Sequence, residues 1–194
     1  FLDAPDRRET LGIPAGVPVV GMIGRLVPDK DPVGFVAAAR AVAGVLPEAR
    51  FLVVGDGPLR PRVQEAVERE GLAGVVIMTG ERPDIPELLA TMDVVVLTSR
   101  WEGMPMVVLE AMASARPVVA PRLGGLTEVI EDGVTGRLTP PGDERAIAEA
   151  VIALLRDAPA RRRMGEQGRA RVRERFSLER MVAQTLAVYR EVRG

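Results

Sequence analysis

The stretch at residues 93–125, DVVVLTSRWEGMPMVVLEAMASARPVVAPRLGG, limits most strongly what this chain can fold into. Residues 94–97 are apolar and mainly β-branched, which is typical of a buried strand. A polar loop follows at 98–103, Pro105 has the place that proline favours in a first helical turn, and residues 106–112 favour a helix. Residues 117–120 form the next apolar run. The order strand, loop, helix, strand predicts one parallel crossover unit.

Two carboxylates mark the turn of this unit. Glu102 lies in the loop where the first strand ends and the helix begins, and Glu110 lies inside the apolar helix. An ionised carboxylate in apolar surroundings is costly unless it is paired or hydrogen-bonded. Glu110 therefore has two interpretations. It lies on a helix flank and reaches solvent or an arginine, or it accepts hydrogen bonds from the hydroxyls of a ligand held near the helix start.

The rest of the chain alternates between the same two kinds of element. Apolar runs predict strands at 17–23, 51–54, 75–78 and 137–139, and periodic segments predict helices at 32–46, 58–70, 84–92, 126–131, 143–156, 160–175 and 177–192. Asp84 and Glu87 have the spacing of a capping box. The pattern predicts an α/β fold with a doubly wound parallel sheet of about six strands and closing C-terminal helices. Residues 1–16 resemble a linker, and residues 17–194 are predicted to form the domain.

Composition excludes several kinds of function. The sequence has 26 basic and 27 acidic residues and a net charge of −1, so a polybasic surface for nucleic acid or membrane is not expected. Cysteine and histidine are absent, which excludes thiolate chemistry and a histidine base or metal ligand in this chain. Lys30 is the only lysine, and its compact, flexible ammonium suits a phosphate site.

Candidate ligand-binding residues follow the predicted strands. Ligands of open α/β sheets bind outside the carboxyl ends of the strands. We therefore expect polar and glycine-rich segments from five loops to meet at one edge of the sheet. These segments are Arg25 and Lys30, residues 55–58, residues 80–84, residues 102–106 and residues 122–127.

The run E-G-M-P-M-V-V-L-E-A-M-A at 102–113, followed by P-V-V-A-P and G-G-L-T-E, resembles the E-x7-E region of the "group 1" retaining glycosyltransferases. The resemblance extends over nearly the whole chain, through residues 24–26 with Lys30, 53–58, Gly80, Asp93, 132–136, 141–143 and 176–177. Met104 and Pro105 stand where many members have Phe-Gly. The resemblance implies the C-terminal, donor-binding domain of a GT-B fold, with Rossmann-like architecture. It also implies that residues 1–16 are an interdomain linker remnant and that the N-terminal, acceptor-binding domain is absent from this sequence.

The resemblance implies a nucleoside-diphosphate sugar as donor and assigns roles to individual residues. Arg25 and Lys30 would bind the pyrophosphate together with amides of the turn formed by Gly103, Met104, Pro105, Met106 and Val107. Glu102 would accept from sugar hydroxyls and Glu110 from the ribose. Gly55 and Gly57 belong to the same rim, and the base would lie near Arg82 and Ile85. Arg25, Lys30 and Glu102 are the candidate catalytic residues.

The expected reaction needs neither a metal nor a cofactor. The sequence has no D-x-D pair and no histidine, so leaving-group charge would be met by Arg25, Lys30 and the helix start. The resemblance implies a hexosyltransferase that retains anomeric configuration, with a glycan, lipid-linked or small-molecule acceptor and no nucleic-acid partner. The isolated domain is expected to be inactive in transfer. Its expected location is cytoplasmic, with contact to the inner membrane face through the N-terminal domain.

Three other functions share part of this sequence pattern. A dinucleotide-binding dehydrogenase is weakly supported, because Gly55 and Gly57 supply only two glycines of the fingerprint and Arg60 stands at the third position. A nucleotide-sugar 2-epimerase would share the GT-B fold. A non-catalytic nucleotide-sugar-binding module would keep the pocket without turnover. The final predicted helix carries an apolar stripe that needs cover, formed by Leu178, Met181, Val182, Leu186 and Tyr189.

Overall fold

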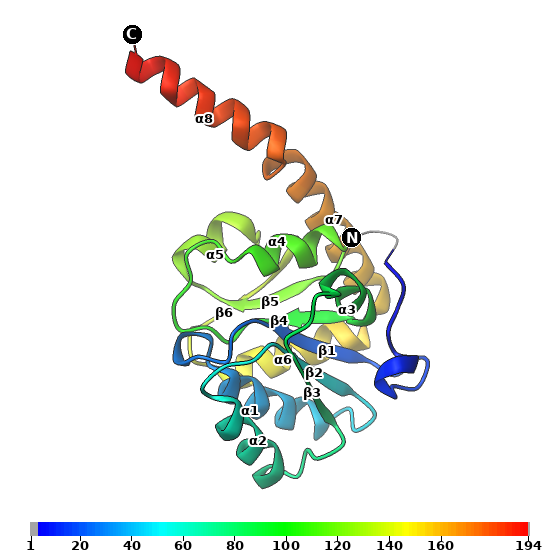
Figure 1. Ribbon diagram of the computed structural model, residues 1–194. Helices are drawn as coiled ribbons and strands as arrows, with labels where there is room; N and C mark the ends of the chain where they lie inside the picture. The colour runs from blue at the N-terminus through cyan, green and yellow to red at the C-terminus, as the bar shows by residue number, and fades with distance from the viewer. Residues whose placement is uncertain (1–3, 194) are drawn as a thin grey trace.

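A six-stranded parallel sheet forms the centre of the molecule, in a computed structural model that describes residues 4–193 (Figure 1). The strand order is β3-β2-β1-β4-β5-β6, and every neighbouring pair is parallel. This confirms the predicted doubly wound, Rossmann-like α/β fold. The strands are β1 (Val19–Ile23), β2 (Arg50–Val54), β3 (Val76–Gly80), β4 (Val94–Val96), β5 (Val118–Pro121) and β6 (Gly136–Thr139).

Helices cover both faces of the sheet. One face carries α1 (Pro32–Ala43), α2 (Arg60–Arg69) and α6 (Glu144–Arg156). The other carries α3 (Ile85–Thr91), α4 (Met106–Ala113) and α5 (Gly124–Val129). Helix α7 (Ala158–Arg175) packs on α6 and α4, and α8 (Leu178–Arg193) projects away from the body of the domain (Figure 1). Short 3-10 helices occur at η1 (Glu9–Leu11) and η2 (Pro28–Lys30).

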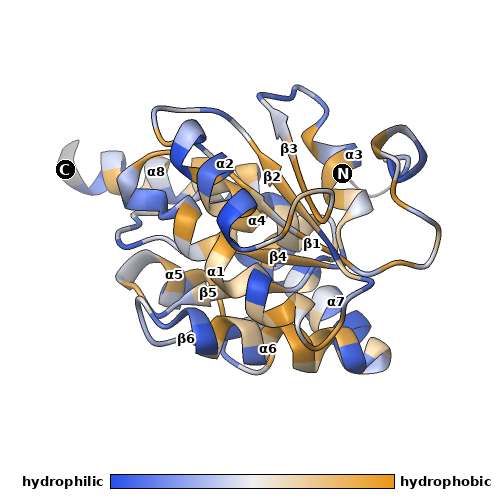
Figure 2. Cartoon of the chain, turned by 90° about the horizontal axis from the view of Figure 1, so that it is seen from below, coloured by the Kyte–Doolittle hydropathy of each residue, from blue (hydrophilic) through white to orange (hydrophobic). Residues whose placement is uncertain are grey.

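Each layer between helices and sheet has its own hydrophobic core. Phe35 of α1 and Phe51 of β2 are buried in the first core, with ring centroids 6.4 Å apart in an edge-to-face arrangement. The second core joins Leu52 of β2 to Leu88 of α3 and Val108 of α4. Figure 2 shows hydrophobic residues concentrated along the strands and on the helix faces turned toward them. The apolar strand runs therefore fix the sheet between two cores, as a parallel sheet requires.

The N-terminal segment is fastened to the amino edge of the sheet from residue 4 onward. The Arg7 amide donates to Thr91, Ile13 is buried, and the Arg8 guanidinium contacts the Asp93 carboxylate at 3.0 Å. Asp93 also accepts from the Val19 amide at 2.9 Å. Residues 1–3 of the segment that we predicted to be a linker lie outside the described residues.

Three local predictions need correction. Asp84 does not cap α3 with its side chain, because its carboxylate is bound by Arg82 through two hydrogen bonds of 2.7 Å. The capping-box prediction was therefore wrong. Pro105 is the residue before the first helical position of α4 instead of lying in the first turn, and α5 begins at Gly124, two residues earlier than predicted.

The apolar stripe of the last helix is exposed. Leu178, Met181, Val182, Leu186 and Tyr189 each expose between 45% and 66% of their surface. Among the helices between residues 4 and 193, none is both long enough and apolar enough to cross a membrane.

Candidate functional site

The candidate site lies where the winding of the sheet reverses. β1 and β4 are neighbours, and from this pair the chain proceeds outward in opposite directions through β2 and β3 and through β5 and β6. The loops that leave β1 and β4 at their carboxyl ends therefore diverge and leave a crevice, which is the usual ligand position in open α/β sheets. The loop after β1 contains η2, and the loop after β4 contains residues 97–105.

Lys30 and Glu102 meet in this crevice. The Lys30 Nζ donates to both carboxylate oxygens of Glu102, at 2.6 and 2.7 Å, and the Ser99 hydroxyl donates to Glu102 Oε1 at 2.6 Å. The Glu102 side chain is only 4% exposed, whereas that of Lys30 is 32% exposed. An ammonium has three N–H donors, so two are already used with Glu102 and one remains for a ligand. The pair lines a small cavity of about 20 Å³, together with Val107 of α4.

Further hydrogen bonds hold the two loops together. The Thr98 hydroxyl lies 3.0 Å from the Lys30 carbonyl oxygen and 2.8 Å from that of Asp31. The Arg100 amide donates to the Asp29 carbonyl at 2.8 Å, and its guanidinium pairs with Asp31 at 3.0 Å. Since Asp31 also caps α1 by accepting from the Gly34 amide, the η2 loop is fixed from both sides. Lys30 and Glu102 therefore belong to one connected polar unit.

The start of α4 forms the next wall of the site. Residue Pro105 precedes the helix, and no side chain caps its first turn. Free amides at a helix start favour an anion, through their N–H groups and the helix dipole. The position of the turn is set from β5 and α5, because a Cβ on Gly125 would overlap the carbonyl oxygen of Gly103, whereas a Cβ on Gly124 would meet nothing within 4 Å.

Arg25 and the glycines of the second loop complete the rim. Gly55 has a φ of 124°, and a Cβ there would overlap the carbonyl oxygen of Gly24. A Cβ on Gly57 would lie 2.6 Å from the carbonyl oxygen of Leu26. The loops after β1 and β2 are therefore in backbone contact. Arg25 itself is exposed, and among the described residues no hydrogen bond or ion pair holds its guanidinium.

The other arginines of this rim have carboxylate partners. Each lies within 3.1 Å of an aspartate oxygen: Arg60 of Asp56, Arg82 of Asp84, Arg100 of Asp31 and Arg122 of Asp132. The hydrogen bond from Arg82 lowers the pKa of Asp84. The guanidinium of Arg82 is therefore occupied, beside the partly buried Ile85. Arg25 remains as the uncompensated cation among the described rim residues.

Glu110 lies one helical turn beyond the start of α4. It is partly buried, and burial raises the pKa of its carboxyl above the ordinary value. Within residues 4–191 its carboxylate has no hydrogen bond or ion pair, so no arginine neutralises it. Glu110 follows Met106 by four residues and Val107 by three, so it shares their side of the helix. Of the two interpretations from the sequence, pairing with an arginine is not observed.

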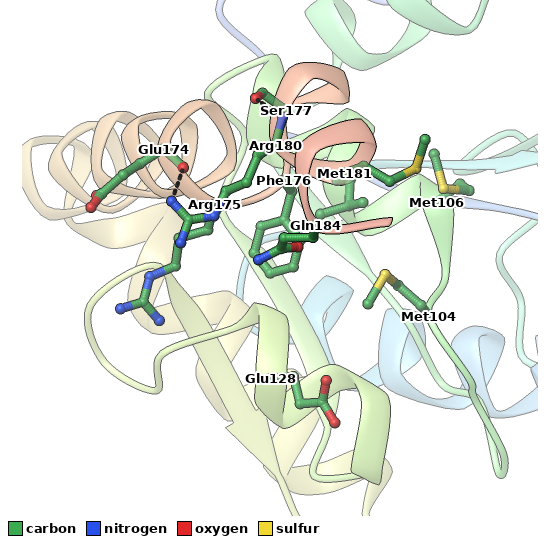
Figure 3. Close-up of a pocket in the computed structure, with 11 residues that line it drawn as sticks. Met104, Met106, Glu128, Glu174, Arg175, Phe176, Ser177, Arg180, Met181 and Gln184 are labelled. Atoms are coloured by element: carbon green, nitrogen blue, oxygen red, sulfur yellow. Dashed lines mark hydrogen bonds between the residues drawn. The ribbon is translucent and has the colours of Figure 1, made fainter. Parts of the chain in front are cut away.

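A larger cavity of about 710 Å³ lies between the α4 start and the junction of α7 and α8 (Figure 3). Met104 and Met106 line it opposite Phe176 and Met181 from the junction of α7 and α8. Met104 and Met106, which we predicted to act through their backbone amides, therefore line this cavity and not the small one beside Lys30 and Glu102. Their exposed fractions are 51% and 62%.

The structure brings most of the predicted site residues to one edge of the sheet. It also adds two that the sequence reasoning overlooked, Ser99 and Thr98. Both belong to the polar loop directly after β4. Their hydroxyls lie near a carboxylate in the sequence of this loop, and this pattern could have indicated that they belong to the site. Among the described residues, no group of three or more histidine, cysteine, aspartate or glutamate side chains is arranged to hold a metal ion.

Comparison with known proteins identifies the family. The family model described as glycosyl transferases group 1 matches residues 3–171. The chain belongs to this family. It spans about half the length of the curated relatives it matches. One relative of this group 1 chain is alpha-D-kanosaminyltransferase of Streptomyces kanamyceticus. The two sequences are 34% identical over 177 residues, which cover 90% of this chain and 46% of the relative.

Solved structures of similar proteins have the same fold. Anabaena Alr3699/HepE, in a complex with UDP and glucose, is 31% identical, with a TM-score of 0.86 over 93% of this chain and 51% of that one. The C-terminal domain of the group 1 protein LpcC from Francisella tularensis is 28% identical, with a TM-score of 0.82 over 92% of this chain and 96% of that one. The group 1 chain is therefore a C-terminal-type domain, one half of a GT-B fold.

Proposed function

We propose that this chain is the donor-binding half of a glycosyltransferase that moves a sugar from a nucleoside-diphosphate sugar to an acceptor hydroxyl, with retention of configuration. The observation that carries the proposal is the grouping of Lys30, Glu102, Arg25 and the uncapped start of α4 at the point where the sheet reverses its winding.

Charge supports a pyrophosphate at this place. Lys30 is already neutralised by Glu102, so Arg25 supplies the net positive charge and the α4 amides supply directed N–H donors. The third N–H of Lys30 is available to a phosphate oxygen while Glu102 keeps the ammonium in place. In the transition state, the same groups would stabilise charge developing on the departing nucleoside diphosphate. Neither a metal nor a cofactor enters this proposal. The sequence contains no histidine that could bind a metal.

The carboxylates supply acceptors for the hydroxyls of the donor. Glu102 accepts from Lys30 and Ser99 on one side and is proposed to accept from the sugar on the other. Glu110 is proposed to accept from the ribose, and the base is proposed to lie near Arg82 and Ile85. The complex of Alr3699/HepE with UDP and glucose makes UDP the first nucleotide to test on this chain. The acceptor of the proposed reaction is expected to bind to an N-terminal domain that this sequence does not contain.

The proposal is tested by calorimetric titration of the chain with UDP, UMP and UDP-glucose, and with GDP and ADP for comparison of the base. We expect a nucleoside diphosphate to bind more tightly than the corresponding monophosphate, because the rim groups bind the pyrophosphate. A chelator is expected to change neither affinity. Equal affinity for UDP and UMP, or binding that strictly requires Mg²⁺, would contradict the proposal.

Glu110 offers a second test. Glu110→Gln is expected to weaken UDP binding by about 1–3 kcal/mol, because ribose hydroxyls lose a charged acceptor. The variant is expected to have little effect on binding of a 2′,3′-dideoxy nucleotide, which has no hydroxyls to donate. If removing the ribose hydroxyls costs wild type and variant the same affinity, Glu110 does not contact them.

Stability of the unliganded protein provides the control for this variant. Burial raises the pKa of Glu110, so the fold favours its protonated form. The resulting contribution to the free energy of unfolding is fully present at a pH below 4.5, the ordinary pKa, and is lost as pH rises through the folded-state pKa. Glu110→Gln removes this titration, so at neutral pH the variant is expected to be at least as stable as wild type in urea unfolding. A marked loss of stability would indicate a structural role.

The alternatives make different predictions. The family match does not favour a 2-epimerase, and release of an epimerised free nucleotide sugar by a longer protein that contains this chain would be needed to support one. A non-catalytic binding module would bind the donor without transfer or slow donor hydrolysis in any longer form of the protein.

A further inference from the structure

A second polar cavity lies at the opposite edge of the sheet from the candidate donor site. It has a volume of about 510 Å³, within the range of small-molecule sites. It is bounded by the residues just before β4 and β5 and by the first half of α7. Its charged lining residues are Asp93, Glu166, Arg116, Arg161, Arg162 and Arg169. Four arginines thus face two carboxylates, which leaves an excess of positive charge.

Two of the nearby arginines already have partners. Arg161 donates to Asp93 at 3.3 Å and to carbonyl oxygens at the end of α6, and Arg8 donates to Asp93 at 3.0 Å. With the Val19 amide added, Asp93 accepts three hydrogen bonds, none of them from Arg116, Arg162 or Arg169. Arg8 and Arg161 are therefore accounted for as structural groups.

Arg116, Arg162 and Arg169 are not accounted for in this way. None of them has a hydrogen bond or ion pair from its side chain to the residues described at 4–191. The Arg116 Nε is shielded from solvent and has no hydrogen-bond partner there. Burial lowers the pKa of Arg116, the nearby Asp93 and Asp6 carboxylates raise it, and the neighbouring Arg8 and Arg161 lower it. Arg116 also lines the cavity, so an anionic ligand there would compensate its charge.

Backbone geometry holds these arginines in place around the cavity. Two residues after the end of α4, Ala115 has a φ of 54°, and the Arg116 amide donates back to the Ala111 carbonyl, which fixes where the Arg116 side chain starts. The turn lies directly against α7, because Gly165 has no side chain and a Cβ there would overlap the Ala115 carbonyl oxygen. Arg162 and Arg169 lie three residues before and four after Gly165, on the same helix face.

We propose that this cavity binds the phosphate group of a small phosphorylated molecule, with Arg116, Arg162 and Arg169 as the recognising groups. Guanidinium groups present planar pairs of N–H donors that match phosphate oxygens. The cavity is larger than a bare phosphate requires, which leaves room for the organic part of the ligand. The site is separate from the donor crevice, since it lies at the amino ends of the strands instead of the carboxyl ends.

The test is titration of the 194-residue chain with inorganic phosphate and with glycerol 3-phosphate at constant ionic strength. The readout is the side-chain Nε–H NMR signal of Arg116, assigned by its loss in Arg116→Gln. We expect a saturable shift of this signal. Arg162→Gln is expected to weaken binding by at least about tenfold, because a charge-assisted hydrogen bond is lost. Binding followed by calorimetry is expected to weaken similarly in Arg116→Gln.

Two matched variants control for nonspecific charge effects. Arg163→Gln removes the same charge from an exposed position on α7 outside the cavity, and Arg25→Gln removes the free cation of the donor crevice. Both are expected to change the affinity read from the Arg116 Nε–H signal by less than about threefold, although Arg25→Gln is expected to weaken phosphate binding in the donor crevice. Equal weakening by Arg162→Gln and Arg163→Gln would overturn the proposal, as would a loss confined to Arg25→Gln or the absence of a saturable shift.

A vesicle arm distinguishes a soluble phosphate from a lipid headgroup. Vesicles of phosphatidylcholine with phosphatidylglycerol are expected to bind wild type and Arg116→Gln equally in sedimentation. If vesicle binding depends on Arg116 and neither soluble phosphate binds, the proposal of a small soluble ligand would be overturned. Folding of every variant is checked by thermal unfolding. Arg116→Gln is expected to unfold at no lower temperature than wild type, because the Arg116 side chain has no hydrogen bond or ion pair within the described chain that the variant would break.

Discussion

The 194-residue chain is expected to bind the proposed nucleotide-sugar donor without measurable sugar transfer. Holding donor and acceptor together in a productive geometry lowers a barrier by up to roughly 7–11 kcal/mol, and the described fold offers only one wall of such a cleft. The chain covers about half of relatives such as alpha-D-kanosaminyltransferase. A longer protein that joins this chain to an acceptor-binding domain is therefore expected to transfer sugar many orders of magnitude faster.

The measurement is release of UDP and formation of glycosylated product, with donor affinity determined on the same samples. Adding a separately produced acceptor-binding domain to the chain is expected to restore part of the activity. Efficient transfer by the 194-residue chain alone, to any acceptor, would show that the active site does not require a second domain. If the chain neither binds the donor nor transfers sugar, the absence of donor binding would contradict the proposed function.

Loss of Lys30 is expected to destabilise the fold as well as the site. Lys30→Met leaves the Glu102 carboxylate, which is 4% exposed, with Ser99 as its remaining side-chain donor. Breaking a buried ion pair by removing one partner costs about 3–5 kcal/mol. Because Lys30 is 32% exposed, solvent reduces this cost, and we expect a loss of about 2–3 kcal/mol in urea unfolding.

The double variant separates the pair from its surroundings. Lys30→Met with Glu102→Gln is expected to recover much of the lost stability, because position 102 then no longer carries a buried, unpaired carboxylate. Arg25→Met is the matched control, since Arg25 is an exposed cation of the same rim, and a change below about 0.5 kcal/mol is expected there. If Lys30→Met is no more destabilising than Arg25→Met, the Lys30–Glu102 pair does not stabilise the fold.

The sequence predicted the sheet and the edge where the site lies because both follow from short-range patterns. The strands are β-branched apolar runs, and the loops that follow them must lie at one edge of a parallel sheet. All six strands were predicted, with small shifts at their ends. The position of Lys30 and Glu102 in the same crevice follows from this topology.

The partners of individual side chains could not be predicted in the same way. Lys30 and Glu102 are 72 positions apart, and their pairing depends on β1 being the neighbour of β4 and on the η2 turn facing the loop after β4. The carboxylate of Asp84 had two possible uses, the helix start or Arg82, and the guanidinium offered two charged hydrogen bonds. Local spacing could not decide between them.

The contact between Gly103 and Gly125 has a consequence for attempts to change the donor specificity. Any side chain at 125 would push back the turn that begins α4, while the adjacent Gly124 faces open space. Combinatorial libraries that vary residues 103–107 alone would explore loop shapes that α5 does not permit. Co-designing the 103–107 turn with the start of α5, and leaving position 125 as glycine, would instead treat the two backbones as one designable unit.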